Sequence, residues 1–464
     1  MVIINERRFF MKYVVVGTSH FGFEAVQTIL KQEPSAEIHL YEAGDHASFM
    51  SCGAQSYLQG IAQALDELHF ATNQSYADQG IHMHYSTAVV GINPEAKTIQ
   101  IKDNEGEKEE SYDKLLLSPG GFAPVPKFEG YDLENVHTFR GREDAGTVKE
   151  RMKSSKKAVV IGAGYIGVEV ATAYTEAGIE TVLLDGLDHI LPTYVDPELA
   201  TVLENHAKEK GLAFKGHEKV QKLTGKDGKV TGVVTDKGEY EADTVVIAVG
   251  VKPDTEWLKG IVDIDERGFV EIDEFMRTSV TDIYAGGDAT KIMYAPTGKK
   301  TNIALATNAR RQGIVAALHA VGKEDIVKML PVSGTSALHV FDYTVVTTGL
   351  GHVSADSYDG KIASAYCEEK VYPDFMRRPG MVHMKIYFDE DTHVILGAQF
   401  VSIHDVADSI NALSIAINAK WTLEQLAMVD FFYQPNYDRP WHYVQVLAHQ
   451  ALGNQFGGAD KILF

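Results

Sequence analysis

The sequence predicts an α/β protein with two nucleotide-binding βαβ units, followed by a third, α+β domain. Two apolar, β-branched runs, residues 13–17 and 158–162, each end in glycine. A helical pattern, a second apolar run and an acidic residue follow each of them, and these acidic residues are Glu42 and Asp185. Short apolar strands that alternate with helices are typical of parallel sheets buried on both faces. After about residue 331 the pattern changes to antiparallel strands, at residues 384–388 and 395–400, and a helix around 407–418.

The composition limits the classes of protein that the chain can belong to. Its 464 residues correspond to two to four globular domains, and 45% of them are hydrophobic. The net charge of −21 argues against a nucleic-acid partner and against binding to an anionic membrane surface. No apolar run is long enough to cross a membrane. Two cysteines form no disulfide framework, and no Cys/His cluster has zinc-site spacing, so we expect a cytoplasmic protein without a metal.

The second unit contains a complete G-x-G-x-x-G motif, which runs Gly162-Ala163-Gly164-Tyr165-Ile166-Gly167. The first glycine permits a tight turn, the second lets the backbone approach a pyrophosphate, and the third lets the helix pack on the strand. Asp185 follows 23 residues after Gly162, near the spacing of the acid that binds a ribose 2′-hydroxyl. Because an acid here repels a 2′-phosphate, the pattern favours NADH over NADPH. The alternative is a purely structural glycine turn.

The first unit carries a weaker form of the motif, Gly17-Thr18-Ser19-His20-Phe21-Gly22, in which serine replaces the middle glycine. Two other features support a dinucleotide here. Glu42 lies 25 residues after Gly17, and the distant run Gly286-Gly287-Asp288 ends a strand. Flavoproteins with two dinucleotide sites place a carboxylate beside the ribityl chain of the flavin in this way. The alternative for Asp288 is a helix cap.

Cys52 stands in the run Ser48-Phe49-Met50-Ser51-Cys52-Gly53. Ser51 is a suitable N-cap, which would place Cys52 on the first helical turn, where the dipole and free N–H groups lower the pKa of a thiol. The alternative is a buried structural cysteine. No second cysteine follows nearby and no His–Glu pair occurs in residues 431–440, so Cys52 can only cycle between thiolate and sulfenic acid or form a mixed disulfide. Cys367 has no companion motif, and we expect it to be incidental.

Together these residues resemble the NADH peroxidase / water-forming NADH oxidase family of flavoproteins, over residues 11 to about 450. The likeness rests on the motifs at residues 17–20, 48–53, 162–169, 286–290 and 304–310. It implies FAD and NADH as cofactors and a homodimer or homotetramer. It also implies an FAD-binding domain in two parts (11–121 and 251–330), an NADH-binding domain (122–250) and a C-terminal α+β dimerisation domain (331–464). Residues 1–10 match no element of this arrangement, and we expect them to be dispensable.

The resemblance also implies roles for individual residues. Cys52 is similar to the redox cysteine, His20 to the histidine beside it, and Arg310 to a residue that supports the peroxide side of the site. The alternatives are a loop spacer for His20 and a core aromatic for Tyr165. The implied cofactor contacts are Gly17, Thr18, Ser19, His20, Phe21, Gly22, Glu42, Cys52, Ser118, Pro119, Gly120, Gly121, Arg140 and Asp288 for FAD, Gly162, Gly164, Tyr165, Ile166, Gly167, Asp185, Tyr194, Gly250 and Ala304 for NADH, and Leu305, Ala306 and Thr307 next to them.

Smaller features bear on the oxidant, which is either hydrogen peroxide or O2. Arg310 and the runs 139–142 and 55–58 favour a peroxidase, while the run 428–435 is equally similar to some oxidases. We therefore expect an NADH peroxidase that works through Cys52, with a water-forming NADH oxidase as the alternative. A CoA-disulfide reductase is less favoured because it would need a cationic channel, which the net charge of −21 supports little. A non-catalytic redox sensor would not need two dinucleotide sites.

Overall fold

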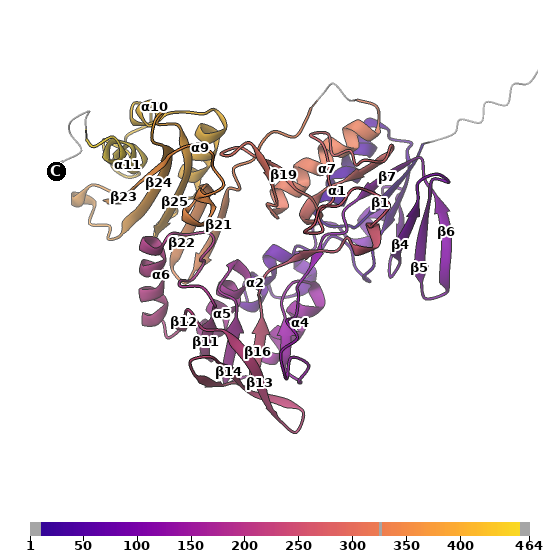
Figure 1. Ribbon diagram of the computed structural model, residues 1–464, viewed down its shortest axis with the longest axis horizontal. Helices are drawn as coiled ribbons and strands as arrows, with labels where there is room; N and C mark the ends of the chain where they lie inside the picture. The colour runs from indigo at the N-terminus through magenta and orange to yellow at the C-terminus, as the bar shows by residue number, and fades with distance from the viewer. Residues whose placement is uncertain (1–10, 324–326, 455–464) are drawn as a thin grey trace, which may run out of the picture.

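The first sheet has the glycine-motif strand at its centre. The computed structural model describes residues 11–323 and 327–454, so the prediction for residues 1–10 lies outside the described residues. The strands of this sheet run in the order β18-β7-β1-β2-β3, and all pairs are parallel. Their bounds are Lys12–Val16 (β1), Glu37–Tyr41 (β2), His82–His84 (β3), Lys114–Leu117 (β7) and Ile283–Ala285 (β18). Because β18 pairs with β7, a late segment of the chain returns to the first sheet (Figure 1).

Helices α1 (His20–Gln32) and α7 (Ala306–Ala320) pack against each other beside this sheet (Figure 1). Gly313 allows their close approach, since a Cβ there would lie 2.4 Å from the carbonyl oxygen of Phe21. Antiparallel strands β4 (Ala88–Asn93), β5 (Thr98–Asp103) and β6 (Gly106–Ser111) stand at the outer edge. The contact between α1 and α7 therefore joins an early and a late segment of the chain in one lobe. We call the parts of the molecule built around the first, second and third sheets the first, second and third lobes.

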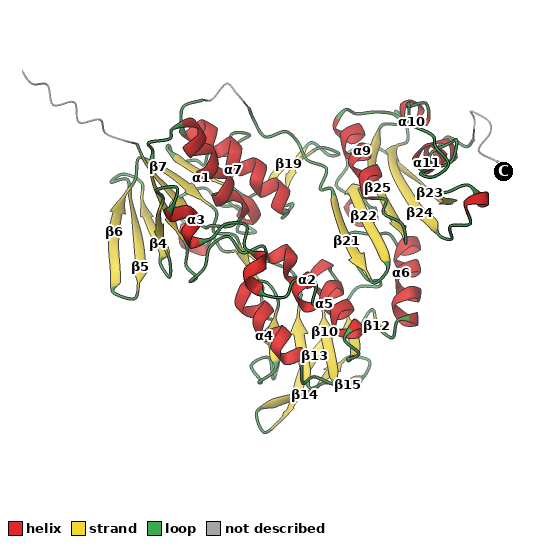
Figure 2. Ribbon diagram, turned by 180° about the vertical axis from the view of Figure 1, so that it is seen from behind, coloured by secondary structure: helices red, strands yellow, loops and turns green. Residues whose placement is uncertain are grey.

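The second sheet repeats the arrangement, with β10 in the middle of the order β12-β11-β10-β16-β9 and every pair parallel. Ala158 and Val160 face the helices, and Val159 and Ile161 face a three-stranded antiparallel sheet, so the central strand is buried on both faces (Figure 2). The bounds are Val136–Thr138 (β9), Lys157–Ile161 (β10), Glu180–Leu184 (β11), Ala213–Lys215 (β12), Thr244–Ile247 (β16), Arg142–Met152 (α4), Tyr165–Glu176 (α5), Val220–Lys226 (β13), Lys229–Thr235 (β14) and Glu239–Glu241 (β15).

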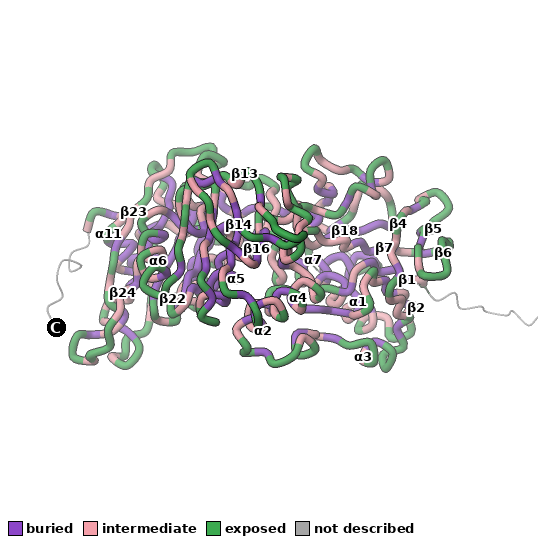
Figure 3. Tube along the Cα trace, turned by 90° about the horizontal axis from the view of Figure 1, so that it is seen from below, coloured by how far each residue is buried: buried purple, intermediate pink, exposed green. Residues whose placement is uncertain are grey.

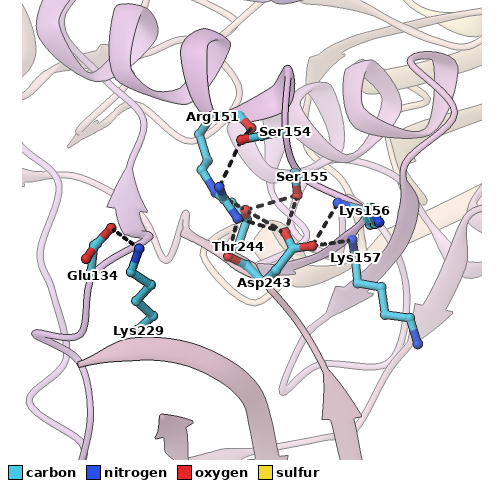
Figure 4. Close-up of polar contacts among 9 residues, drawn as sticks. All are labelled: Glu134, Arg151, Ser154, Ser155, Lys156, Lys157, Lys229, Asp243 and Thr244. Carbon is cyan, nitrogen blue, oxygen red and sulfur yellow. Dashed lines mark hydrogen bonds and ion pairs between the residues drawn. The ribbon is translucent and has the colours of Figure 1, made fainter. Parts of the chain in front are cut away.

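A polar cluster fixes the amino ends of β10 and β16, at the edge of the sheet away from the glycine loop (Figure 4). One carboxylate oxygen of Asp243 accepts a hydrogen bond from Ser155 at 2.6 Å, and the other accepts one from the backbone N–H of Lys156 at 2.8 Å. Arg151, near the end of α4, donates to Thr244 at 2.9 Å. The cluster therefore ties the carboxyl end of α4 to the amino ends of β10 and β16, and the carboxyl ends of these two strands lie at the opposite edge of the sheet.

The third sheet is antiparallel and has the order β21-β22-β25-β24-β23. The predicted strands correspond to β24 and β25, and the predicted helix is α9, Ala407–Asn418. The fold class expected from the sequence is therefore confirmed. The bounds are Ser336–Val340 (β21), Tyr343–Gly349 (β22), Ile362–Lys370 (β23), Met381–Asp389 (β24), Ile395–Ser402 (β25), Leu423–Ala427 (α10) and Tyr443–Ala451 (α11).

The remaining elements are short or connect the lobes. Helix α6 (Pro197–Glu209) lies between the second and third sheets and contacts β25 (Figure 1). The others are α2 (Ala54–Leu58), α3 (Asn73–Ala77), α8 (His352–Ala355) and the strand pairs β8 (Gly121–Phe122) with β17 (Lys252–Pro253) and β19 (Ile292–Tyr294) with β20 (Lys299–Thr301). Strands such as β1, β10 and β25 form the buried interior, while β6 and many connecting loops are exposed (Figure 3). Among the described residues, no helix combines the length and apolar character that a membrane span requires.

Candidate active site

The second glycine motif has the geometry that its spacing predicts. Gly162 has φ of +105°, which disfavours other residues, and a Cβ there would lie 2.4 Å from the carbonyl oxygen of Ala248. A Cβ on Gly167 would lie 1.7 Å from the carbonyl oxygen of Gly162, so only glycine lets α5 pack this closely on the strand. At Gly164 a Cβ would meet nothing within 4 Å. The loop is therefore closely packed against the protein at Gly162 and Gly167, and it borders open space at Gly164, at the amino end of α5. A phosphate needs this open space to approach the helix terminus closely.

The two acidic residues hold their glycine loops in corresponding ways. Glu42 accepts hydrogen bonds from the Thr18 hydroxyl at 2.5 Å and from the backbone N–H of Gly44 at 3.0 Å. Asp185 accepts from the backbone N–H of Ala163 at 2.6 Å. Each acid thus stands beside the first turn of its motif, at the carboxyl end of a parallel strand, which is the usual place for nucleotide binding in such sheets.

A cavity of about 1190 Å3 opens between the three lobes. A Cβ added to Gly164, Gly186 or Gly250 would meet nothing within 4 Å, so bare backbone borders open space there. The residues present therefore fit an extended dinucleotide. The predicted contact residues that line the cavity are Arg140, Gly162, Gly164, Tyr165, Ile166, Asp185, Tyr194, Gly250, Asp288, Ala304 and Leu305. Gly167 packs inside the motif, and Ala306 and Thr307 begin α7 directly after the lining residue Leu305.

Two tyrosines stack at the wall of this cavity. The rings of Tyr165 and Tyr194 lie 3.8 Å apart and nearly parallel. The Tyr165 hydroxyl is 2.6 Å from the Ser336 hydroxyl, which belongs to the C-terminal sheet. Burial raises the pKa of Tyr165 to about 12, so its hydroxyl stays protonated at neutral pH. Tyr165 therefore lines the cavity instead of belonging only to the core, and its contact with NADH stays a prediction.

Arg140 connects two of the other predicted flavin contacts, Gly121 and Asp288. Its Nη2 lies 2.8 Å from a carboxylate oxygen of Asp288, and its Nε donates to the carbonyl oxygen of Gly121 at 2.8 Å. Asp288 lies inside a short 3-10 turn, Gly287–Ala289, whose N-cap is Gly286, so it is not a helix cap. Ser118 completes the group, because a Cβ on Gly287 would lie 3.1 Å from its hydroxyl. Pro119 and Gly120 lie on the same loop.

Cys52 is exposed and lies in a 3-10 turn, Ser51–Gly53, that leads into the five-residue helix α2. Met50 is the N-cap and makes no side-chain cap, so the predicted capping by Ser51 is wrong. Desolvation by the surrounding protein raises the pKa of the Cys52 thiol, its own backbone N–H and the charge of Arg310 lower it, and the charge of Glu169 raises it. The predicted lowering of this pKa is therefore wrong for the chain itself, because desolvation outweighs the lowering by the backbone N–H and by Arg310.

His20 and Arg310 are in direct contact. Nε of Arg310 donates a hydrogen bond to Nδ1 of His20 at 3.2 Å, and Arg310 also forms an ion pair with Glu24. The His20 ring stacks on Phe70 at 4.8 Å, and the guanidinium lies 4.9 Å from the same ring. Burial and the charge of Arg310 lower the pKa of His20. Since the charge of Arg310 acts on both His20 and Cys52, the three predicted catalytic residues share one electrostatic environment.

Glu169 is the functional candidate that the sequence analysis missed. Burial raises the pKa of its carboxyl to about 7, and its charge acts on Cys52. It lies four residues after Tyr165 on α5, so the two share a helix face, and this spacing could have identified it. Cys367, in contrast, is buried in β23, and burial raises its pKa to about 12. Burial and the raised pKa disfavour the thiolate, which is the reactive form of a cysteine, while the expectation that Cys367 is incidental stays a prediction.

Comparison with known sequences identifies the class. The sequence model of the pyridine nucleotide-disulphide oxidoreductases matches residues 11–313, and that of their dimerisation domain matches residues 335–443. The chain therefore belongs to the pyridine nucleotide-disulphide oxidoreductase family, in its NADH oxidase/peroxidase branch. It is an enzyme with FAD and NADH as cofactors. The dimerisation domain indicates a homo-oligomer, while the choice between dimer and tetramer stays a prediction.

Individual relatives match almost the whole chain. The NADH oxidase of Enterococcus faecalis is 37% identical over 447 residues, which is 96% of this chain and 100% of the relative. The structure of the water-forming NADH oxidase of Lactobacillus brevis bound to NADH superposes with a TM-score of 0.92 at 36% identity, covering 96% of this chain and 98% of the other. The NAD-dependent persulfide reductase of A. fulgidus gives a TM-score of 0.92 at 31% identity, covering 96% and 84%.

Proposed function

We propose that the chain is a water-forming NADH oxidase that reduces O2 with NADH and uses Cys52 to complete the reduction. The observation that carries this proposal is the full-length likeness to proteins named as NADH oxidases, at 37% identity in sequence and a TM-score of 0.92 in structure. This favours the alternative of the sequence analysis over its first expectation, the NADH peroxidase.

The arginines that favoured a peroxidase in the sequence are engaged by side chains of the protein itself. Arg310 contacts Glu24 and His20. In the run 139–142, Arg140 pairs with Asp288, and Arg142 pairs with Asp66 at 2.6 Å. Because these arginines have protein partners, their presence in the sequence does not require a peroxide to bind. They therefore do not separate the two oxidants, and the whole-chain likeness is the stronger support.

The residues that would hold the cofactors are those around the two glycine loops. Glu42, Arg140 and Asp288 would hold FAD, and the second glycine motif with Asp185 would hold NADH. FAD and NADH supply the hydride transfer and the first, two-electron reduction of O2 to hydrogen peroxide. The protein supplies the binding, the orientation and the thiol.

Cys52 then acts on the peroxide. Its thiolate attacks one oxygen, so that an S–O bond forms, the O–O bond breaks and hydroxide leaves. The product is a sulfenic acid, and two further electrons from NADH with protons return it to the thiolate and release water. In this proposal His20, which shares Arg310 as an electrostatic neighbour with Cys52, donates a proton to the leaving oxygen. Because its Nδ1 accepts from Arg310, the proton of the neutral ring is on Nε2.

The stoichiometry of turnover tests the proposal. Complete reduction should consume two NADH for each O2 and leave no hydrogen peroxide, whereas a peroxide-forming oxidase consumes one. Anaerobic NADH with hydrogen peroxide is the second measurement. Rapid anaerobic turnover with peroxide, together with negligible consumption of O2, would identify a peroxidase and refute the proposal. The third measurement uses NADH and CoA disulfide without O2, and it examines the alternative of a CoA-disulfide reductase. Cys52 is exposed, so it could form a mixed disulfide with a small thiol, and the likeness to a persulfide reductase is the reason to include this substrate.

A further inference from the structure

Asp196 is a buried aspartate at the start of α6, next to the second sheet, and its side-chain partners belong to the C-terminal sheet and to helix α8. It is fully buried and stands at the N-cap of α6, yet its side chain does not cap that helix. An aspartate at an N-cap ordinarily bonds the free N–H groups of the first turn. Here the carboxylate is used for contacts that reach across to another lobe.

The contacts define what we call the Asp196 cluster. One carboxylate oxygen accepts from Gln399 Nε2 at 2.8 Å and from the backbone N–H of His352 at 3.2 Å. The other lies 2.7 Å from the Lys385 ammonium and accepts from the Tyr387 hydroxyl. The backbone N–H of Asp196 donates to Gln399 Oε1 at 2.8 Å. Burial acts to raise the pKa of Asp196, but the bonds from Lys385, Tyr387 and Gln399 outweigh it and leave the pKa lowered.

The cluster stands at one end of the segment that carries Tyr194. At the other end, the backbone N–H of Leu191 donates to the carbonyl oxygen of Ala163, inside the glycine motif, at 2.8 Å. Residues 191–196 are thus held at two points, and Tyr194 lies between them, stacked on Tyr165. Tyr194 and Gln399 both line the nucleotide cavity. The position of one cavity wall therefore depends on a residue that touches the C-terminal sheet.

We propose that Asp196 is a positioning residue for NADH, which ties residues 191–196 to the C-terminal sheet and so holds Tyr194 against Tyr165 at the cavity wall. The inference rests on the proposed placement of NADH in this cavity. It makes the affinity for NADH depend on the contact between the second and third lobes, in addition to the residues that touch the nucleotide.

The test compares Asp196→Asn with the matched control Glu198→Gln. Glu198 also pairs with Lys385, at 2.9 Å, but its side chain is 45% exposed and lies beyond residues 191–196. NADH affinity is measured by anaerobic titration of the holoenzyme after its flavin has been reduced chemically, so that NADH binds without transferring a hydride. Hydrogen exchange of residues 191–196 is followed in parallel. Thermal unfolding of each variant reports any general loss of stability. The ratio of water to hydrogen peroxide formed reports the Cys52 side of the site.

For Asp196→Asn we expect the Kd for NADH to rise by about fivefold or more, which corresponds to about one net hydrogen bond. The KM for NADH should rise with it, while kcat at saturating NADH and the product stay unchanged, and exchange of residues 191–196 should become faster. Glu198→Gln should change the Kd by less than about twofold. If Asp196→Asn does not fold, Tyr387→Phe, which removes one donor, should raise the Kd in the same direction.

Two outcomes would overturn the inference, and they are distinguishable. If the wild-type protein binds NADH and the folded Asp196→Asn, or Tyr387→Phe in its place, binds it equally well, the cluster only joins two lobes. If the wild-type holoenzyme binds no NADH at all, the proposed placement of NADH fails, and the inference fails with it.

Discussion

Arg310 donates a hydrogen bond from Nε to Nδ1 of His20 across 3.2 Å. A guanidinium has no acceptor and stays charged, so this bond requires a lone pair on Nδ1 and therefore a neutral His20. Burial and the Arg310 charge both lower the pKa of His20, in agreement with the neutral ring. The pair therefore fixes which nitrogen of His20 carries the proton that the site can donate.

Arg310→Gln should move the acid limb of the pH–rate profile to higher pH. The histidine has a lowered pKa, so in the wild type it becomes charged only below its ordinary range. Removing the guanidinium raises this pKa, and it also raises the pKa of the Cys52 thiol, which the charge of Arg310 lowers. Less of the attacking thiolate is then present at slightly acidic pH. We expect the rate at slightly acidic pH to fall severalfold, measured as NADH oxidation across the pH range. Arg311→Gln is the matched control, because Arg311 bonds Asn308 on the same helix. Equal shifts in both variants would refute the role of Arg310.

Cys52→Ser should change the product and leave the first reduction running. Serine cannot form a sulfenic acid, so hydrogen peroxide made from O2 would no longer be reduced. We expect NADH-dependent O2 consumption to continue and hydrogen peroxide to accumulate at about one equivalent per NADH. The measurement combines an oxygen electrode with a peroxide assay.

The control for this substitution is Cys367→Ser. Its thiol is buried in β23 and has a raised pKa, so the variant should still form water. Loss of all O2 consumption in a folded, flavin-containing Cys52→Ser protein would contradict the separation of the two reduction steps. Accumulation of peroxide in Cys367→Ser would contradict the assignment of the second step to Cys52.

The fold was predictable where short-range patterns determine structure. The apolar runs that end in glycine became β1 and β10, and the apolar spacing around residues 407–418 became α9 with the same limits. Burial on both faces of a parallel sheet leaves a continuous apolar run, and glycine is required where a Cβ would strike a carbonyl oxygen. Both requirements are visible in the order of residues along the chain.

The site was predictable only in part, because some of its properties depend on contacts between distant segments. The pKa of Cys52 depends on Glu169, Arg310 and the surrounding protein, and no local pattern of residues measures that desolvation. Asp196, before Pro197, has the pattern of an ordinary helix start, yet it bonds Gln399, which is 203 residues away. Contacts of this kind become visible only when the lobes are placed against each other.

Asp185→Ala should narrow the preference for NADH over NADPH. The Asp185 carboxylate stands beside the glycine loop, where it would face a 2′-phosphate. It also accepts from the backbone N–H of Ala163 and of Leu187, so its loss should loosen the loop. We therefore expect kcat/KM to fall by about tenfold for NADH and to fall less, or rise, for NADPH.

The matched control for this prediction is Asp188→Ala. Asp188 lies on the same loop, but its side chain is 60% exposed and pairs with His217. Its removal should leave the ratio of the two kcat/KM values unchanged. An Asp185→Ala enzyme with the wild-type ratio would contradict the specificity role, whatever the loss in absolute rate.

Glu169→Gln should change how the reactivity of Cys52 depends on pH. The pKa of Glu169 is about 7, so its carboxyl is neutral on the acid side of this value and anionic on the alkaline side. The anion raises the pKa of the Cys52 thiol and so opposes the thiolate as pH increases. We expect the variant to react faster with iodoacetamide above neutrality, by severalfold, and equally fast below it.

The alkylation rate is best measured in a Cys367→Ser background, so that Cys52 is the reacting thiol. Glu176→Gln is the matched control, because Glu176 is an exposed residue of the same helix that bonds Gln59. Only Glu169→Gln removes a charge that acts on Cys52 and appears near neutral pH. Only this variant should therefore lose the restraint on the alkylation rate above neutral pH. If Glu169→Gln and Glu176→Gln gave the same profile as the parent protein, the carboxylate of Glu169 would have no influence on the thiol.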